Sequence, residues 1–212
     1  MMFHNRSHAA NLLVQELAAH RGQGPLVLGI PGGGVPMARH IADALGADLD
    51  VVLVRKIGHP SSKEVAIGAI GEDGEVRLGP GAAGVSTAYV DAEAARQFSR
   101  IARMRALLTP SHAAVDVRGR TCIVVDDGAA TGHTMLAAVH SLHARGAKRV
   151  VAALPVASVE AYWLLASVAD DVVCLHAPEG FHSVGHFYED FRPVRDDEVA
   201  AALGSSEARV TA

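Results

Sequence analysis

Short runs of β-branched and aliphatic residues alternate with longer Ala- and Leu-rich segments along most of the chain. This alternation is typical of a parallel sheet whose two faces are covered by helices. It predicts five core strands, at Leu26–Ile30, Val51–Val54, Thr121–Val125, Arg149–Leu154 and Asp171–Leu175. It predicts helices over Ser7–Ala19 and Pro36–Leu45, and from about Thr131 and Ser158 onward. The pattern therefore indicates an α/β fold of three layers.

The alternation stops over residues 58–119. Within this stretch two apolar runs, Val65–Ile70 and Glu75–Leu78, flank the turn residues Gly71–Gly74, which is a hairpin signal. A helix that contains several Arg residues is predicted over Asp91–Leu108. We interpret the stretch as a hood inserted over the sheet, and expect its hairpin to add an antiparallel edge strand to that sheet.

Composition limits the class of protein. The 212 residues suit a single domain, residues 1–212, and half of them are hydrophobic while only 4% are aromatic, so the core must consist of Val, Leu, Ile and Ala. Lys and Arg number 19 against 23 Asp and Glu, which gives a net charge of -4. No basic stripe is visible, and we expect no nucleic-acid partner.

The distribution of apolar residues predicts a cytoplasmic protein without a membrane partner. The longest apolar run, Val150–Ala157, is too short to span a bilayer, and residues 1–10 lack the apolar core of a signal peptide. Cys122 and Cys174 lie within apolar runs and are expected to be buried, reduced thiols.

The segment Cys122–Met135 carries the strongest functional signal. It consists of an apolar strand, the acidic pair Asp126 and Asp127, a turn of small residues and the start of a helix. Unpaired N–H groups at a helix start bind phosphate, and small residues let phosphate oxygens reach them. Carboxylates just before such a cradle can accept hydrogen bonds from the vicinal hydroxyls of a sugar. The alternative is a plain strand-to-helix turn capped by Asp. The expected phosphate-binding residues are Gly128, Ala129, Ala130, Thr131, Gly132, His133 and Thr134.

This segment resembles, residue by residue, the signature with which type I phosphoribosyltransferases bind 5-phosphoribosyl-1-pyrophosphate (PRPP). The resemblance implies that Asp126 and Asp127 bind the ribose 2- and 3-hydroxyls and that the following loop binds the 5-phosphate. It also implies a catalytic role for Asp127. The likeness extends from Arg6 to about Leu203, and it implies the three-layer type I fold.

The loop after the first strand, Gly29–Ala38, is similar to the pyrophosphate loop of that family, which contains a cis non-proline peptide. Gly32, Gly33 and Gly34 would let backbone N–H groups converge on phosphate oxygens. A dinucleotide-binding G-x-G-x-x-G loop would need Gly at Met37, so that alternative fails. Related bacterial sequences usually read Pro-Arg-Gly-Gly here, so Gly32 stands where a cation would face the pyrophosphate.

After the second predicted strand, Val54–Pro60 resembles the start of the mobile catalytic loop of the family. The resemblance implies that Arg55 and Lys56 neutralise the pyrophosphate as it leaves. The alternative is a basic strand end that faces solvent.

The segment Glu179–Phe191 is similar to the segment of hypoxanthine-guanine phosphoribosyltransferases that holds the purine and an outer Mg²⁺ ligand. The resemblance implies that Phe181, His182 and Val184 contact the base and that Glu189 or Asp190 is the Mg²⁺ ligand. The alternative is aromatic packing over the edge of the sheet.

Two histidine pairs have helical spacing. They are His140 with His143 and His182 with His186, and neither has a Cys or carboxylate at metal-ligand spacing. We therefore expect no dedicated zinc site.

The first and third predicted strands should be neighbours, because this order brings the Gly32 and Asp126 loops together around one ligand. The expected reaction is displacement of pyrophosphate from PRPP by a nitrogen of a purine-like base, with Mg²⁺ chelated by substrate oxygens. Related enzymes often dimerise, so a homodimer is expected. Two alternatives remain: a PRPP- or nucleotide-sensing protein without catalysis, and a phosphatase or nucleotide hydrolase that uses the acidic pair.

Overall fold

The core of the fold is a five-stranded parallel sheet with strand order β2-β1-β6-β7-β8. The computed structural model describes residues 1–110 and 113–204. β1 and β6 are neighbours, in register from Leu26 opposite Cys122 to Gly29 opposite Val125, which confirms the predicted strand order. The strands are β1 (Leu26–Gly29), β2 (Asp48–Val51), β6 (Thr121–Val125), β7 (Arg149–Val156) and β8 (Asp171–His176).

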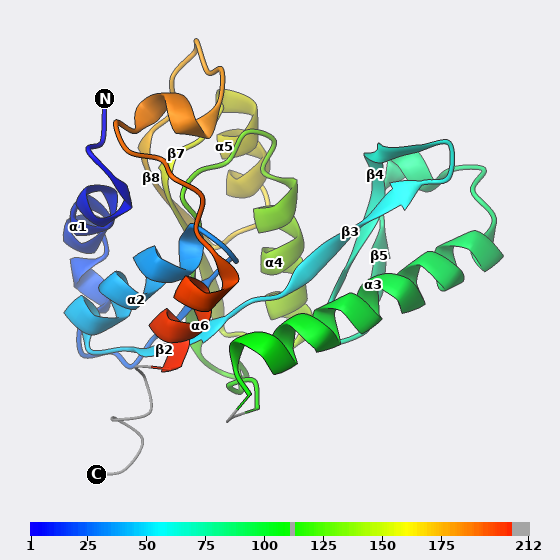
Figure 1. Ribbon diagram of the computed structural model, residues 1–212, viewed down its shortest axis with the longest axis horizontal. Coiled ribbons are helices and arrows are strands. Elements are labelled where there is room, and N and C mark those ends of the chain that lie inside the picture. The colour runs from blue at the N-terminus through cyan, green and yellow to red at the C-terminus, as the bar shows by residue number, and fades with distance from the viewer. Residues whose placement is uncertain (111–112, 205–212) are drawn as a thin grey trace.

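Helices cover both faces of this sheet (Figure 1). One face packs against α1 (Arg6–Glu16), α2 (Gly34–Leu45) and α6 (Asp196–Gly204), and the other against α4 (His133–Ala144) and α5 (Val159–Ala166). Successive residues of a strand point to opposite faces, so each strand supplies both cores. In β1, Val27 joins the first core, while Leu26 and Leu28 join the second. The predicted three-layer α/β fold is confirmed.

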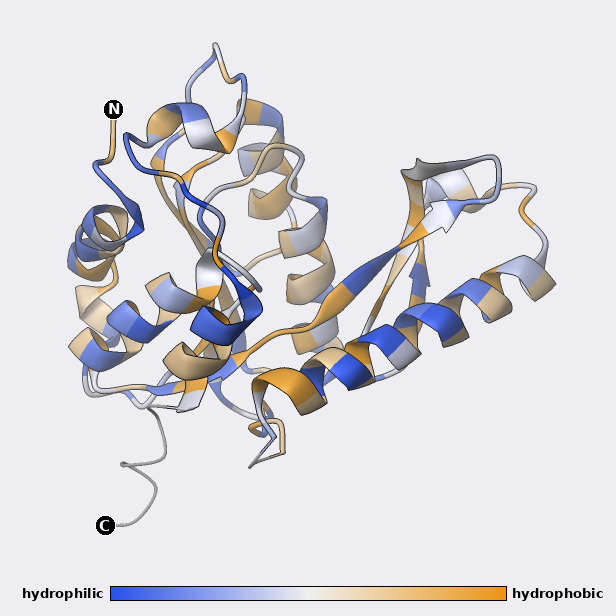
Figure 2. Cartoon of the chain, in the orientation of Figure 1, coloured by the Kyte–Doolittle hydropathy of each residue, from blue (hydrophilic) through white to orange (hydrophobic). Residues whose placement is uncertain are grey.

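The hood extends away from this core (Figure 1). Its strands β3 (Val54–His59), β4 (Ser62–Gly71) and β5 (Val76–Leu78) form an antiparallel sheet of their own, followed by the long helix α3 (Thr87–Leu108). The predicted hairpin is confirmed, with Ile70 opposite Val76. The expected edge strand on the main sheet is wrong, because the partner of β4 on its other side is β3. Hydrophilic and hydrophobic stretches alternate along α3 (Figure 2), as expected for a helix with one packed face.

The second core strand was predicted three residues too late. β2 occupies Asp48–Val51, and Val54 already begins β3. The two aspartates made this strand look polar, yet the Asp50 side chain is only 2% exposed. It is buried because Arg105 of α3 binds it, with 2.6 Å between Nη1 and Oδ1. The ion pair offsets the cost of burying the carboxylate, so Asp50 can lie in a core strand. Arg105 reaches it only in the folded chain.

Arg105 fastens the hood to the main sheet. Besides Asp50, its guanidinium binds both carboxylate oxygens of Glu72 at 2.8 Å and donates to the carbonyl oxygen of Val51 at 2.9 Å. Glu72 belongs to the turn after β4. One side chain of α3 therefore joins β2 to the β4–β5 hairpin.

Several boundaries differ from the predictions. α1 ends at Glu16 and is followed by the short helix η1 (Ala18–His20), while α3 begins at Thr87. α6 was not predicted, although its first turn is acidic, which suits a helix start. The remaining short helices are η2 (Pro80–Ala82) and η3 (Val184–Phe187). Across residues 1–110 and 113–204, no helix is both long and apolar enough to cross a membrane.

Candidate functional site

Two loops meet where β1 and β6 end. The N–H of Ile30 donates to the carbonyl of Val125 at 2.9 Å, which brings the glycine loop against the start of the acidic loop. A Cβ atom on Gly33 would lie 1.8 Å from Oδ2 of Asp127, and one on Gly34 would lie 2.4 Å from the carbonyl oxygen of Val125. Only glycine fits at these two positions, so the close approach of the loops depends on them.

The peptide between Pro31 and Gly32 is cis, as the resemblance implied. A Cβ atom on Gly32 would lie 3.3 Å from the carbonyl oxygen of Val194, a tight but bearable contact. A side chain at position 32 would therefore begin against the C-terminal segment of the chain rather than against Asp127.

The start of α4 forms an open cradle beside the acidic pair. Gly132 caps the helix with a φ of +73°, a conformation that other residues rarely adopt, and His133 is the first helical residue. The first N–H groups of a helix have no partner within it. Ala130, Thr131, His133 and Thr134 are all exposed around these groups. The arrangement suits a phosphate group.

Ala129 does not belong to this open cradle. Its N–H donates to the carbonyl of Val156 and its carbonyl accepts from the N–H of Ser158, both at 2.9 Å, and the residue is buried. The loop continues the pairing with β7 for one residue beyond the strands, as the bridge to Ala157 shows. The expected cradle therefore narrows to residues 130–134.

The acidic pair is partly buried, and both carboxyl groups have raised pKa values. Burial and the neighbouring charge of Asp127 raise the pKa of Asp126 well above its ordinary value. Burial also raises the pKa of Asp127, while the hydrogen bond and charge of Arg6 oppose that rise. Oδ1 of Asp126 accepts the N–H of Asp127 at 2.9 Å, so the pair is fixed in place.

Two residues that hold Asp127 were missed. Nε of Arg6 donates to Oδ2 of Asp127 at 2.8 Å, and the hydroxyl of Tyr188 donates to its carbonyl oxygen at 2.7 Å. Both lie far from Asp127 in the sequence, at either end of the chain. The signal that could have found Arg6 is a lone Arg at a helix start, where its charge is unfavourable to the helix dipole.

The C-terminal segment lies over the acidic loop. Val184 covers Gly128, because a Cβ atom there would lie 2.6 Å from a methyl carbon of Val184. Phe181 is half-buried and stacks on Phe187, with ring centroids 5.5 Å apart. His182 is exposed, and its ring lies 5.8 Å from that of His186. Val184 thus adjoins the site, while Phe181 also has the packing role that was the alternative.

The two expected Mg²⁺ ligands differ in their surroundings. Oε2 of Glu189 lies 2.6 Å from Nδ1 of His4, whereas the carboxylate of Asp190 accepts the N–H of Arg192 at 3.3 Å. Within residues 1–110 and 113–204, no group of three or more His, Cys, Asp or Glu is arranged to hold a metal ion.

Arg55 and Lys56 lie on β3 rather than in a loop. Both are exposed, and they pair with Ile70 and Ala69 of β4. The predicted loop start is wrong because the apolar residues of β4 provide a partner strand. Consecutive strand residues point to opposite faces, so the side chains of Arg55 and Lys56 project from opposite faces of the hood sheet.

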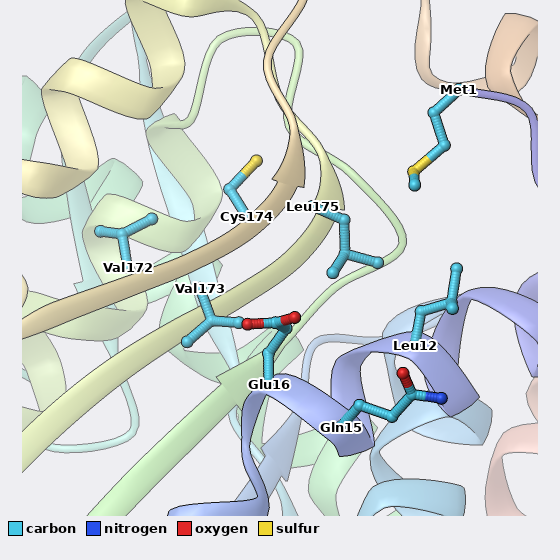
Figure 3. A pocket seen from close by; sticks show the side chains of 8 residues that line it. All are labelled: Met1, Leu12, Gln15, Glu16, Val172, Val173, Cys174 and Leu175. Carbon is cyan, nitrogen blue, oxygen red and sulfur yellow. The ribbon is translucent and has the colours of Figure 1, made fainter.

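A separate hollow of about 450 Å³ lies between α1 and the edge strand β8 (Figure 3). Glu16 of α1 points toward Val173 across it, and Cys174 lies on its strand side. Burial raises the pKa of the Cys174 thiol. None of the site residues predicted from the sequence lines this hollow.

The glycine loop meets the acidic pair beside the open start of α4, where β1 and β6 end side by side in the parallel sheet. The fold is that of the type I phosphoribosyltransferases. A family model described as phosphoribosyl transferase domain matches residues 4–186, and the chain belongs to this family.

Two curated relatives come from Mycobacterium tuberculosis, strains CDC 1551 / Oshkosh and ATCC 25618 / H37Rv, and both are provisionally named phosphoribosyl transferases. Each is 40% identical over 205 residues, which is 95% of this chain and 46% of the relative. The chain thus spans about half the length of these relatives.

Two solved structures are similar. TT1426 from Thermus thermophilus is 43% identical with a TM-score of 0.88, over 96% of this chain and 98% of that one. The purine phosphoribosyltransferase from Pyrococcus horikoshii is 16% identical with a TM-score of 0.50, over 90% of this chain and 92% of that one. The second likeness shows a shared fold.

Proposed function

We propose that this protein binds PRPP and transfers its phosphoribosyl group to a ring nitrogen of a purine-like base, releasing pyrophosphate. The observation that carries the proposal is the contact between the glycine loop at Gly33 and the carboxylate of Asp127, beside the open start of α4. Groups that suit a pyrophosphate, two ribose hydroxyls and a phosphate are thereby collected within one site.

The donor would lie across three neighbouring segments. Residues 130–134 would bind the 5-phosphate through helix-start N–H groups and the Thr131 and Thr134 hydroxyls. Asp126 and Asp127 would accept the ribose hydroxyls, and residues 32–34 would bind the pyrophosphate through the backbone. Asp127 touches the ribose in this arrangement, which is the sense in which it would be catalytic.

In the reaction, the bond from C1 of the ribose to the pyrophosphate oxygen breaks and a bond from C1 to the base nitrogen forms. The nitrogen loses its proton to solvent or to the departing pyrophosphate. Positive charge grows on the ribose ring and negative charge on the leaving group, so the protein contributes mainly orientation and charge stabilisation. When bound, Mg²⁺ chelated by substrate oxygens would offset the charge of the pyrophosphate, with Asp190 or Glu189 as an outer ligand.

The C-terminal segment would hold the acceptor. Val184 already covers the acidic loop at Gly128, and Phe181 and His182 precede it on the same segment. Stacking of a base on such side chains contributes about 1 to 3 kcal/mol. Replacing Phe181 or His182 with Ala is therefore expected to weaken a nucleoside monophosphate more than ribose 5-phosphate.

The experiment that tests the proposal incubates the protein with PRPP, Mg²⁺ and a panel of purines, pyrimidines and amines, and measures released pyrophosphate. Turnover with one base class supports it, and an absence of PRPP binding by calorimetry contradicts it. Arg55→Ala and Lys56→Ala are then assayed separately. Because the two side chains point to opposite faces of β3, one variant is expected to lose turnover at least ten-fold while the other changes little.

A PRPP- or nucleotide-sensing protein without catalysis is the second candidate. Gly32 favours it, because the loop lacks the Arg that related bacterial sequences carry. Tight PRPP binding together with no turnover on the whole panel would favour this candidate.

The partners and location follow from the same proposal. PRPP and a nucleobase-like molecule are the expected small-molecule partners, and a second copy of the chain is expected in a homodimer. Burial raises the pKa of the Cys122 thiol to about 11, and such unreactive thiols suit the reducing cytoplasm.

A further inference from the structure

Arg6 lies where the parts of the proposed site meet. It is the first residue of α1, and its side chain is only 14% exposed. Both Nε and Nη2 contact Oδ2 of Asp127 at 2.8 Å. This ion pair fixes the orientation of a carboxylate that belongs to the acidic pair.

The same guanidinium contacts the glycine loop and the C-terminal segment. A Cβ atom on Gly33 would lie 2.5 Å from Nε of Arg6, so cation and loop are in direct contact. Nη1 donates to the carbonyl oxygen of Arg192 at 2.8 Å, and Cζ lies 4.1 Å from the centre of the Phe191 ring. A guanidinium over an aromatic face is an attractive cation–π contact.

The charges around Asp127 show what Arg6 contributes. Asp126 adjoins it as a second carboxylate, and the Tyr188 hydroxyl donates to its carbonyl oxygen. Burial disfavours a negative charge on Asp127 while Arg6 favours it, and on Asp126 the charge of Asp127 adds to the effect of burial. Arg6 thus supplies the opposing charge in direct contact with the pair.

We propose that Arg6 is a positioning residue that holds Asp127 as an oriented carboxylate and ties it to the C-terminal segment, so that the ribose and base subsites form together. Nε and Nη2 of Arg6 both contact Oδ2 of Asp127, so the other carboxylate oxygen, Oδ1, would accept the ribose hydroxyl. This inference rests on the proposed function and adds the N-terminal segment to the site. If Arg6 acted only through packing, its removal would instead lower affinity by the same factor at every pH.

The test measures the affinity of PRPP and ribose 5-phosphate by calorimetry from about pH 5 to 9 for wild type, Arg6→Gln and Arg6→Lys. Without the guanidinium, Asp127 takes up its proton at a higher pH, so Arg6→Gln is expected to weaken both ligands at least ten-fold near neutral pH. The pH at which affinity falls on the acid side should also move upward. Arg6→Lys should keep the acid-side fall in affinity close to its wild-type pH, since it retains the positive charge.

Two controls separate charge from packing. Arg118→Gln removes a cation that is 78% exposed and precedes β6, at the other end of the strand from the loops, and it should leave both affinities unchanged. Phe191→Leu removes the ring under the guanidinium but keeps the ion pair. It should therefore weaken binding of a nucleoside monophosphate without changing the pH at which affinity falls on the acid side.

The proposal is overturned if Arg6→Gln binds PRPP as wild type does, or if it loses the same factor at all pH values and Arg6→Lys restores nothing. If Arg6→Gln does not fold, the comparison rests on Arg6→Met, which is also uncharged. In that variant, an acid-side fall in affinity at the same pH as in wild type would overturn the proposal. If wild type binds neither ligand, the proposed function fails. The ion pair is then tested by melting temperature. The folded Arg6 variant is expected to melt below wild type by a difference that grows as the pH rises. A difference that stays constant across pH contradicts the role of Arg6.

Discussion

At the scale of single residues, the site depends on how closely two loops approach. Gly33 and Gly32 are adjacent, yet their surroundings differ sharply. A Cβ atom on Gly33 would lie 1.8 Å from Asp127 and 2.5 Å from Arg6, whereas one on Gly32 would only touch the Val194 carbonyl at 3.3 Å. The two glycines therefore form a matched pair for substitution.

Gly33→Ala is expected to push apart the Asp127–Arg6 pair and to weaken PRPP binding by at least ten-fold, which is about 1.4 kcal/mol or more of binding free energy. Gly32→Ala should keep PRPP affinity within about three-fold, because a shift of a few tenths of an ångström in the C-terminal segment accommodates it. Calorimetry measures the PRPP affinity of both variants. Equal losses would show that the glycine loop does not meet the ligand through Gly33.

Asp126 shows a conflict between binding and stability at the same scale. Its pKa is raised by burial, so the folded protein holds the proton more tightly than the unfolded chain does. The carboxyl group therefore favours folding most below its ordinary pKa of 3.8, and this contribution is lost as the pH rises through the raised folded value. At neutral pH the ionised group costs stability.

Asp126→Asn is accordingly expected to melt at a higher temperature than wild type near neutral pH, with the difference shrinking toward about pH 4. The amide oxygen can still accept the N–H of Asp127. PRPP affinity should fall by about 1.5 to 3 kcal/mol, because hydrogen bonds to a charged acceptor are lost. Thermal melts across pH, paired with calorimetry, measure both effects. A variant that is less stable at neutral pH would contradict this account of Asp126.

At the scale of elements, the hood is held to the sheet by a buried cluster of charges. Arg105 of α3 binds Asp50 of β2 and Glu72 of the β4–β5 turn, whose side chains are 2% and 12% exposed. β3 carries Arg55 and Lys56 between these anchors. The position of the proposed pyrophosphate-stabilising cations therefore depends on an ion cluster outside the site.

Arg105→Ala is expected to lower the free energy of unfolding by about 3 to 5 kcal/mol, because it leaves the buried Asp50 without its cation and Glu72 with only Arg145, 3.8 Å away. Urea denaturation measures the loss. Arg103→Ala is the matched control on the same helix, since Arg103 is exposed and donates only to the Ser99 carbonyl among the contacts the structure describes. A small effect at both positions would mean that water or other cations replace Arg105.

At the scale of the whole molecule, the two ends of the described chain join over the site. Phe3 is fully buried, its N–H donates to the Phe187 carbonyl at 2.8 Å, and its carbonyl accepts the N–H of Glu189 at 2.9 Å. Its ring lies 5.3 Å from that of Tyr188, which donates to Asp127. The N-terminal segment thus supports the segment proposed to bind the base.

Phe3→Ala is expected to cost about 3 to 5 kcal/mol of unfolding free energy through the cavity that it leaves. The folded fraction should bind a nucleoside monophosphate more weakly while keeping its affinity for ribose 5-phosphate, since the phosphate cradle lies on α4. Met2→Ala, at a side chain that is half exposed, is the control and should change neither quantity. Equal losses for both ligands would place the effect outside the base subsite.

The sequence by itself determined the α/β class, the neighbouring positions of β1 and β6, the hairpin in the hood, and the Asp126 and Gly32 loops. These features depend on local periodicity and on short contiguous motifs, because residues close together in the sequence determine the conformation of such segments. The tertiary structure alone decided where charge could be buried: Asp50 is in a strand because Arg105 reaches it, and Asp127 is held by Arg6 and Tyr188. It also turned Arg55 and Lys56 into strand residues and drew Ala129 into the pairing with β7. Such partners lie tens of residues away in the sequence, so no local pattern predicts them. The ion pairs and hydrogen bonds that they form stabilise the protein only once the chain has folded.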